Sequence, residues 1–293
     1  MSSAAATTPA APDLSGRIAR LFVYPVKSCA GVEVTEAVLT PTGLDLDRAW
    51  MVVDAQGEFM SQRELPRMAL IKVQLKHHEV VLRAPGMLAL HLAIDAVEAP
   101  VRVRVWNDEV AAYDMGDVAA QWFTDFLGQR LRLVRFDPDH RRLSDLQWTG
   151  GIEAPNQFAD GYPVLVASAA SLAGLNERLV RAGQPPVGIE RFRPNIVVDG
   201  IEAHDEDRVQ LLRIGAEPQA VLKLVKPCSR CTIPDVDPQT GERGTAVGDA
   251  LQAYRQDPRL GGAVTFAMNA VVLEGEDAVL RVGQPVSGHW KFD

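Results

Sequence analysis

The segment Lys226-Pro-Cys-Ser-Arg-Cys231, continuing Thr-Ile-Pro-Asp-Val-Asp-Pro-Gln-Thr-Gly241, is the most informative part of the chain. It directly follows an apolar stretch, residues 221–225, that is typical of a strand. The segment places two thiols beside the cations Lys226 and Arg230. Because nearby positive charge favours the thiolate over the thiol, we expect at least one thiolate at neutral pH. Thiolates are soft ligands, so the segment favours a metal that tolerates sulfur.

Four other interpretations of Cys228 and Cys231 stay open at this point. A CxxC pair is often half of a zinc site, but no second CxxC and no suitably spaced histidine pair supplies the other ligands. A thioredoxin-like pair should begin a helix, whereas two prolines follow here. Asp235 and Asp237 hint at calcium, but Gly241 falls one position late for an EF-hand loop. Both cysteines could also be small buried apolar residues.

The bulk composition of the 293 residues bounds the class of protein. A hydrophobic content of 47% supports a real core, in one large domain or two ordinary ones. The net charge of −8 disfavours binding to nucleic-acid polymers and to anionic membranes. Three cysteines do not make a disulfide framework, so we expect a cytoplasmic protein. Residues 1–16 lack the apolar core of a signal peptide, and we expect a disordered tail.

Short strands separated by turn signals dominate the pattern, which is typical of barrels and sandwiches. The expected strands are residues 18–24, 49–53, 70–75, 80–82, 88–94, 101–105, 164–167, 196–198, 221–225, 270–273 and 279–282. The expected helices are residues 117–127, 169–182 with Ser168 as N-cap, and 249–255. The polar stretch 137–156 is expected to be a domain junction or a long active-site loop. The pattern predicts a β-rich chain of two packed barrel-like units with a few helices.

Two further segments suit an anionic ligand. Tyr24-Pro-Val-Lys-Ser-Cys-Ala-Gly31 leaves an expected strand and offers a lysine, a hydroxyl and backbone amides. In Arg191-Phe-Arg-Pro-Asn195 the proline keeps the backbone extended, so Arg193 and Asn195 should emerge at the mouth of the next strand. Arginine binds phosphate through paired, charge-assisted hydrogen bonds. A solvated lysine and a surface arginine cluster are the alternatives.

Several common catalytic motifs are absent from the sequence. No G-x-G-x-x-G segment opens a helix, and neither a P-loop, a G-x-S-x-G elbow nor an H-E-x-x-H motif occurs. Dinucleotide binding, nucleotide hydrolysis and serine hydrolysis therefore have no support in the sequence.

Taken together, these segments resemble MOSC-domain proteins that carry an N-terminal MOSC β-barrel, the group of the YcbX-like proteins and the mitochondrial amidoxime reducing components. The resemblance covers the chain from about residue 18 to near the C-terminus, and its motifs occur in the expected order. They are residues 24–29, 43–50 and 61–67 for the N-terminal barrel, and 192–196, 228–231, 237–241, 253–255 and 282–285 for the MOSC domain.

The resemblance implies an α+β, β-rich fold, with an N-terminal MOSC-type barrel domain (residues 17–135) packed on a MOSC β-barrel domain (residues 136–291). It implies a monomeric oxidoreductase that uses a molybdenum–molybdopterin cofactor to reduce small N-hydroxylated compounds. Pyridoxal phosphate binding is a family-level possibility. No cysteine follows Cys231, so we expect no iron–sulfur cluster in this chain and electrons from a separate ferredoxin- or flavin-type reductase.

The resemblance also carries individual residues over. It implies that Cys231, rather than Cys228, is the molybdenum ligand and a catalytic residue, and Asp237 is a candidate proton donor because it lies just past the ligand turn. The residues expected to bind the cofactor are Lys27, Ser28, Arg48, Gly161, Tyr162, Arg193, Asn195, Ser229, Arg230 and Asn269.

Two alternatives to an enzyme remain. MOSC domains could instead carry sulfur or the molybdenum cofactor to other proteins, without turnover of substrate. Cys228 and Cys231 could also form a thiol redox switch that binds no metal.

Overall fold

A closed barrel of seven strands forms the larger unit of the computed structural model, which describes residues 11–96, 99–215, 217 and 219–291. The strands follow one another around the barrel in the order β12-β13-β1-β19-β14-β15-β17, and β17 pairs again with β12 to close it. Their bounds are β1 Leu14–Val23, β12 Val164–Ser168, β13 Ile196–Asp199, β14 Val209–Ile214, β15 Ala220–Ser229, β17 Ala263–Glu274 and β19 Pro285–Trp290. The short strands β2 (Val32–Val34) and β16 (Gln256–Asp257) extend this sheet at β1 and β17.

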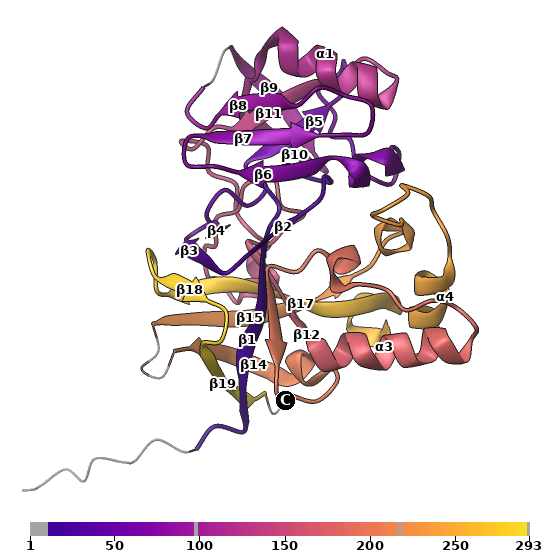
Figure 1. Cartoon of the computed structure of the whole chain (residues 1–293). Coiled ribbons are helices and arrows are strands. Elements are labelled where there is room, and N and C mark those ends of the chain that lie inside the picture. Colours follow the sequence, from indigo (N-terminus) through magenta and orange to yellow (C-terminus); the bar gives the residue numbers. More distant parts are fainter. Residues whose placement is uncertain (1–10, 97–98, 216, 218, 292–293) are drawn as a thin grey trace, which may run out of the picture.

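Strand β1 completes the barrel although it is the first strand of the chain (Figure 1). It lies between β13 and β19 and pairs antiparallel with both, with Leu14 opposite Gly288 and Leu21 opposite Ile196. The expected disordered tail is therefore wrong for its last residues, because Leu14 is buried in the barrel core. Residues 1–10 lie outside the described part. The partner strands β13 and β19 are remote in sequence, and polar residues surround Leu14. The local sequence therefore gave no indication that Leu14 begins a strand.

The N-terminal unit consists of two small sheets and one helix above the barrel (Figure 1). One sheet has the order β5-β11-β10-β9 and the other β6-β7-β8, with a core that includes Trp50, Phe123 and Leu133. A third small sheet, β18-β3-β4, joins residues from both ends of the chain. The bounds are β3 Glu36–Thr40, β4 Gly43–Leu44, β5 Trp50–Val53, β6 Lys72–Leu75, β7 Glu79–Arg83, β8 Leu90–Ala93, β9 Pro100–Val105, β10 Asp108–Asp114, β11 Arg132–Phe136 and β18 Val279–Arg281.

The two long predicted helices are confirmed. Helix α1 spans Gly116–Leu127 and ends at Gly128, which has a left-handed backbone. Helix α3 spans Ala169–Arg181, and the Ser168 side chain accepts a hydrogen bond from the Ser171 amide as its N-cap. Helix α3 and the shorter helix α4 (Ala246–Gln252) cover one side of the barrel (Figure 1). The β-rich class with a few helices is thereby confirmed.

Helix α4 spans Ala246–Gln252 and begins before the predicted start at residue 249. The Asp235 carboxylate accepts hydrogen bonds from the amides of Val247 and Gly248 and so caps the helix from outside it. A cap supplied by a preceding turn leaves no signal at the helix start itself, which explains the shifted prediction.

The predicted polar connection 137–156 contains the short helix α2, Leu146–Thr149. This connection is anchored by the buried Arg142 side chain, which donates hydrogen bonds to the carbonyl oxygens of Gln157 and Ala159.

Among the described residues, no helix is long and apolar enough to cross a membrane.

Candidate functional site

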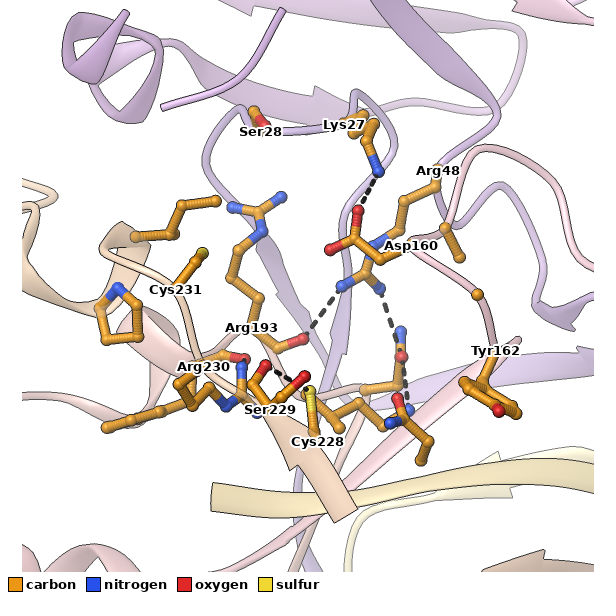
Figure 2. A pocket seen from close by; sticks show the side chains of 18 of the residues that line it. Lys27, Ser28, Arg48, Asp160, Tyr162, Arg193, Cys228, Ser229, Arg230 and Cys231 are labelled. Carbon is orange, nitrogen blue, oxygen red and sulfur yellow. Dashed lines mark hydrogen bonds and ion pairs between the residues drawn. The ribbon is translucent and has the colours of Figure 1, made fainter. Parts of the chain in front are cut away.

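A cavity of about 800 Å³, counted with its open mouth, lies where the N-terminal unit meets the barrel. The structure brings every predicted cofactor-binding residue to its wall (Figure 2). These residues are Lys27, Ser28, Arg48, Gly161, Tyr162, Arg193, Asn195, Ser229, Arg230, Cys231 and Asn269. Lys27 and Ser28 follow β1, Ser229 ends β15 and Asn269 lies within β17, whereas Arg48 lies between β4 and β5 of the N-terminal unit. The packing of the N-terminal unit on the closed barrel therefore assembles these residues.

The wall of this cavity is strongly cationic, although the whole chain carries a net charge of −8. Asp160 is the carboxylate that lines it. Such a concentration of guanidinium and ammonium groups attracts an anionic ligand and offers it charge-assisted hydrogen bonds. The cations are Lys27, Arg48, Arg63, Arg191, Arg193 and Arg230.

Three of the lining residues have a strained backbone. Ser28, Arg48 and Arg193 have φ values of 67°, 52° and 57°, in the left-handed region that favours glycine. Each such residue costs about 1–3 kcal/mol, and strained residues cluster at functional sites. The three strained residues all line the same cavity. Their unfavourable backbone conformations are consistent with a wall that is shaped to bind a ligand.

Arg48 and Arg193 both stack on the buried ring of Tyr24. Their guanidinium carbons lie 4.4 Å and 4.3 Å from the ring centroid. Arg48 also donates to the Arg193 carbonyl at 3.0 Å, and Arg193 donates to the Cys29 carbonyl at 2.6 Å. The second amino group of Arg193, Nη2, is buried and has no hydrogen-bond partner in the described part of the chain. It is therefore a donor available to a ligand in the cavity.

Two of the predicted ligand-binding side chains are instead committed to the protein. The Asn195 amide accepts a hydrogen bond from the Leu165 amide and donates one to the Phe22 carbonyl. The Arg230 guanidinium donates to the carbonyls of Phe266 and Phe192. These groups tie neighbouring strands together and fix the shape of the wall, and the structure gives them this positioning role.

Lys27 is buried and forms an ion pair with Asp160, with Nζ and Oδ1 2.6 Å apart. Nζ also donates to the Phe158 carbonyl at 2.8 Å. Burial lowers the pKa of Lys27 to about 8 and outweighs the opposing effect of Asp160. Lys27 therefore keeps its charge at neutral pH but loses it in mildly alkaline solution.

The three cysteines differ sharply in environment. Cys29 is buried, and burial raises its pKa to about 12. Cys228 is half-buried, and burial also raises its pKa, although the Arg230 charge opposes this. Cys231 is exposed at the cavity wall, which makes it the accessible thiol of the three.

The cation beside Cys231 is not one of its sequence neighbours. Arg63 Nη1 lies 3.3 Å from the Cys231 sulfur. Lys226, which the sequence suggested for this role, points to the Trp148 ring instead, 5.0 Å from its centroid. The prediction that Lys226 and Arg230 act on the thiols holds for Arg230, whose charge opposes the rise in the pKa of Cys228, whereas the Lys226 ammonium lies over Trp148.

Asp237 does not line the cavity. Its carboxylate forms an ion pair with Arg191 at 3.0 Å and accepts hydrogen bonds from the amides of Gln239 and Thr240. These bonds close the turn that follows the thiol segment. Asp237 therefore stabilises this turn and does not face the cavity that Cys231 lines.

The donor set argues against a bare metal ion. Within the described residues, no three His, Cys, Asp or Glu side chains are placed to hold a metal together. This disfavours the zinc and calcium alternatives, which need several protein ligands. One exposed thiol, an unpartnered Arg193 amino group and cationic walls fit a metal that arrives with its other ligands on an anionic organic group.

Arg63 and Asp160 are the principal site residues that the sequence did not identify. Arg63 lies in residues 61–67, which carry the family resemblance, and Asp160 directly precedes the predicted Gly161 and Tyr162, but nothing in either segment marks these two side chains. Tyr24, the ring beneath the two arginines, was seen only as a strand end. Their roles depend on contacts between distant parts of the chain.

Comparison with known proteins identifies the protein family to which this fold and this site belong. Residues 15–130 match the MOSC N-terminal beta barrel domain, and residues 153–287 match the MOSC domain. The human mitochondrial amidoxime-reducing component 1 is 37% identical over 285 residues, which cover 92% of this chain and 82% of that protein. The human mitochondrial amidoxime reducing component 2 is 35% identical and covers 82% and 72% of the two chains. The chain therefore belongs to the family of MOSC-domain proteins that includes these amidoxime-reducing components.

Among solved structures, the YUAD protein from Bacillus subtilis covers 95% of this chain and 98% of its own, at 11% identity and a TM-score of 0.40. That likeness is too low to add to the family assignment.

Proposed function

We propose that this protein binds a molybdenum–pterin cofactor in the cationic cavity, with Cys231 as the protein ligand to the metal, and reduces small N-hydroxylated compounds. The observation that carries the proposal is the exposed Cys231 thiol on the wall of a cavity lined by six cations. Membership in the family of the amidoxime-reducing components supports the class of substrate.

The residues that would hold the cofactor follow from their contacts. Arg193 offers its unpartnered Nη2, whereas Lys27 and Arg48 are ion-paired with Asp160 and Asp47 and add a smaller positive charge for a phosphate. Asn195 and Arg230 keep the wall in shape through their bonds to the backbone. When bound, the cofactor supplies a two-electron redox centre, and the protein supplies binding, orientation and electrostatics.

The overall reaction breaks one N–O bond. An N-hydroxylated compound takes up two electrons and two protons and yields the N–H compound and water. We propose that the electrons come from a separate ferredoxin- or flavin-type protein, since the chain has three cysteines and an iron–sulfur cluster of the plant type needs four. Arg63, beside the Cys231 sulfur, would stabilise negative charge that develops at this end of the cavity.

Metal analysis of matched cysteine variants tests the proposal. Protein purified from a molybdenum-replete host should contain molybdenum, Cys231→Ala should lose it, and Cys228→Ala should retain it. Wild type without molybdenum, or Cys231→Ala that keeps it fully, contradicts the ligand assignment. Turnover of benzamidoxime with a supplied reductase then tests the activity.

Exposure of the Cys231 thiol also supports a second candidate, a carrier of sulfur or cofactor. A carrier would transfer its bound group to an acceptor protein on mixing and would not turn over N-hydroxylated compounds. The same preparations distinguish the two functions, because only the enzyme consumes benzamidoxime.

A further inference from the structure

A second hollow lies next to the cationic cavity and shares one wall with it. It holds about 1300 Å³ of empty space, counted with its opening. Cys231, Arg63 and Tyr162 line both hollows, so the exposed thiol lies at their junction. We call the second hollow the outer groove; beyond the shared wall it is lined by Trp106, Asn107, Asp108, Arg142, Leu143, Asp145 and Lys226.

The two hollows differ in chemistry. The strained residues Ser28, Arg48 and Arg193 belong to the cationic cavity alone. The lining of the outer groove has four cations, Arg63, Arg142, Lys226 and Arg230, and three carboxylates, Asp108, Asp145 and Asp160; the buried Arg142 is paired with Asp108 at 2.7 Å. The outer groove is therefore close to neutral and partly aromatic, and suits an uncharged or weakly charged organic molecule rather than a phosphate.

Trp106 is the unusual residue of this groove. Trp106 lies in a two-residue turn between β9 and β10, and its φ is 56°. At this position of such a turn a positive φ is usually adopted by glycine. A bulky side chain in this conformation is strained, so the turn itself gives no reason for a tryptophan. The side chain is nevertheless 45% exposed on the groove wall.

The Trp106 ring is also held in a fixed position. Its indole nitrogen donates to Asp160 at 3.2 Å, and the Phe59 ring lies 4.9 Å away. The Arg63 guanidinium carbon lies 4.6 Å from the centroid of the Trp106 ring, and Arg63 Nη1 contacts the Cys231 sulfur. Trp106 is thus connected through a single side chain to the exposed thiol. A rigid, exposed aromatic ring beside a reactive centre is a suitable surface for a planar ring.

A hydrogen-bonding group lies beneath the wall of the same groove. The buried hydroxyl of Tyr162 has no partner in the described part of the chain. Tyr162 lines both hollows through other atoms of its side chain or backbone, so its unsatisfied hydroxyl lies beneath the junction and would need a shift of the ring to reach a ligand.

We propose that the outer groove is the substrate subsite and that Trp106 determines specificity, stacking on the aromatic ring of N-hydroxylated substrates whose N–OH group points to the Cys231 end. This inference rests on the proposed function, because it assigns the cationic cavity to the cofactor. It predicts a preference for aromatic over aliphatic N-hydroxylated compounds that a tryptophan-to-aliphatic change removes.

Calorimetric titration without any reductase tests this, because no turnover occurs. The probes are benzamidoxime and acetamidoxime, which share the N-hydroxylated group and differ in the ring. Wild type should bind benzamidoxime more tightly. Trp106→Leu should weaken benzamidoxime binding about fivefold, the order of one aromatic pair, with little effect on acetamidoxime. Trp106→Phe should retain most of the preference, and Leu88→Ala, an exposed apolar residue outside the groove, serves as the matched control.

An unchanged ratio of the two affinities in Trp106→Leu overturns the proposal. Molybdenum content of the same preparations separates this failure from failure of the proposed function. Molybdenum-loaded, active protein with an unchanged ratio rejects the subsite alone. Protein without molybdenum that still shows the Trp106-dependent ratio rejects the proposed function and the substrate assignment with it, and leaves the outer groove as a site that binds aromatic rings through Trp106.

Discussion

Arg63 Nη1 lies 3.3 Å from the sulfur of Cys231, although 168 positions separate the two residues in the chain. The segment that carries Arg63 is held there by Arg243, which donates to the carbonyl of Gln62 at 3.1 Å. Gln62 in turn donates to the carbonyl of Ser28 at 2.7 Å. The N-terminal unit thus places a cation beside a thiol that belongs to the barrel domain.

Loss of the Arg63 charge should change the relative rates at which anionic and neutral reagents alkylate Cys231. In Arg63→Gln, alkylation of Cys231 by anionic iodoacetate should slow relative to neutral iodoacetamide. The ratio of the two rates should fall about fivefold at low ionic strength, the effect of one unit charge at close range in water. Peptide mass spectrometry follows the modification site by site. Arg104→Gln removes an exposed arginine that lines neither hollow and should keep the wild-type ratio. The same fall in both variants would contradict the assignment.

Anion binding in the cavity should weaken as the pH rises through about 8. Burial lowers the pKa of Lys27 to about 8, so the ammonium that attracts an anion is lost above that pH. Calorimetric titration with sulfate, whose charge does not change in this range, between about pH 6.5 and 9.5 measures the effect. Lys27→Met should bind more weakly at pH 7, roughly tenfold for one charge-assisted hydrogen bond, and should show no midpoint near pH 8. Wild-type affinity that does not change across this range would refute the role of Lys27.

The Tyr24 ring should matter more than its hydroxyl. The ring lies beneath Arg48 and Arg193, whereas the buried hydroxyl has no partner in the described part of the chain. Tyr24→Phe should therefore change the free energy of unfolding by less than about 1 kcal/mol. Tyr24→Leu should cost about 2–4 kcal/mol, because it removes two cation–π contacts and leaves a gap. Equal losses in both variants, measured by urea unfolding, would show that the hydroxyl carries the effect.

Stability should fall between about pH 4.5 and 7 because of Glu206. This buried carboxyl accepts hydrogen bonds from the Ser168 amide and the Ser171 hydroxyl, and burial raises its pKa to about 7. The folded state therefore holds a proton that the unfolded state releases at about 4.5. The stabilising contribution is complete below 4.5 and is lost as the pH rises through 7.

Unfolding in urea at pH 5 and pH 8 measures this contribution of Glu206. Glu206→Gln should reduce the difference in unfolding free energy between the two conditions by up to about 3 kcal/mol. The exposed Glu202→Gln is the matched control and should leave the difference unchanged. An unaltered difference in Glu206→Gln would mean that another group produces the pH dependence.

The local sequence was sufficient for the features that short stretches encode. Helices α1 and α3 follow from apolar periodicity and from the stop at Gly128 and the cap at Ser168, all of which are contacts within a few residues. The thiol segment and the ordered motifs were also enough to indicate the family, because each motif is a local string. The bare CxxC string did not distinguish Cys231 from Cys228, and only the family resemblance favoured Cys231.

Tertiary structure alone decided how these pieces meet. Strand β1 closes the barrel through pairing with β13 and β19, and this pairing brings Lys27 and Arg193 to one cavity. Arg63 reaches Cys231, while Asp237 is turned to Arg191 instead of the cavity. The physical reason is that these contacts depend on the register of strands far apart in the sequence, and register is set by burial across the whole barrel rather than by any one segment. The sequence determined which residues were available to the site; the closed barrel determined which of them face it.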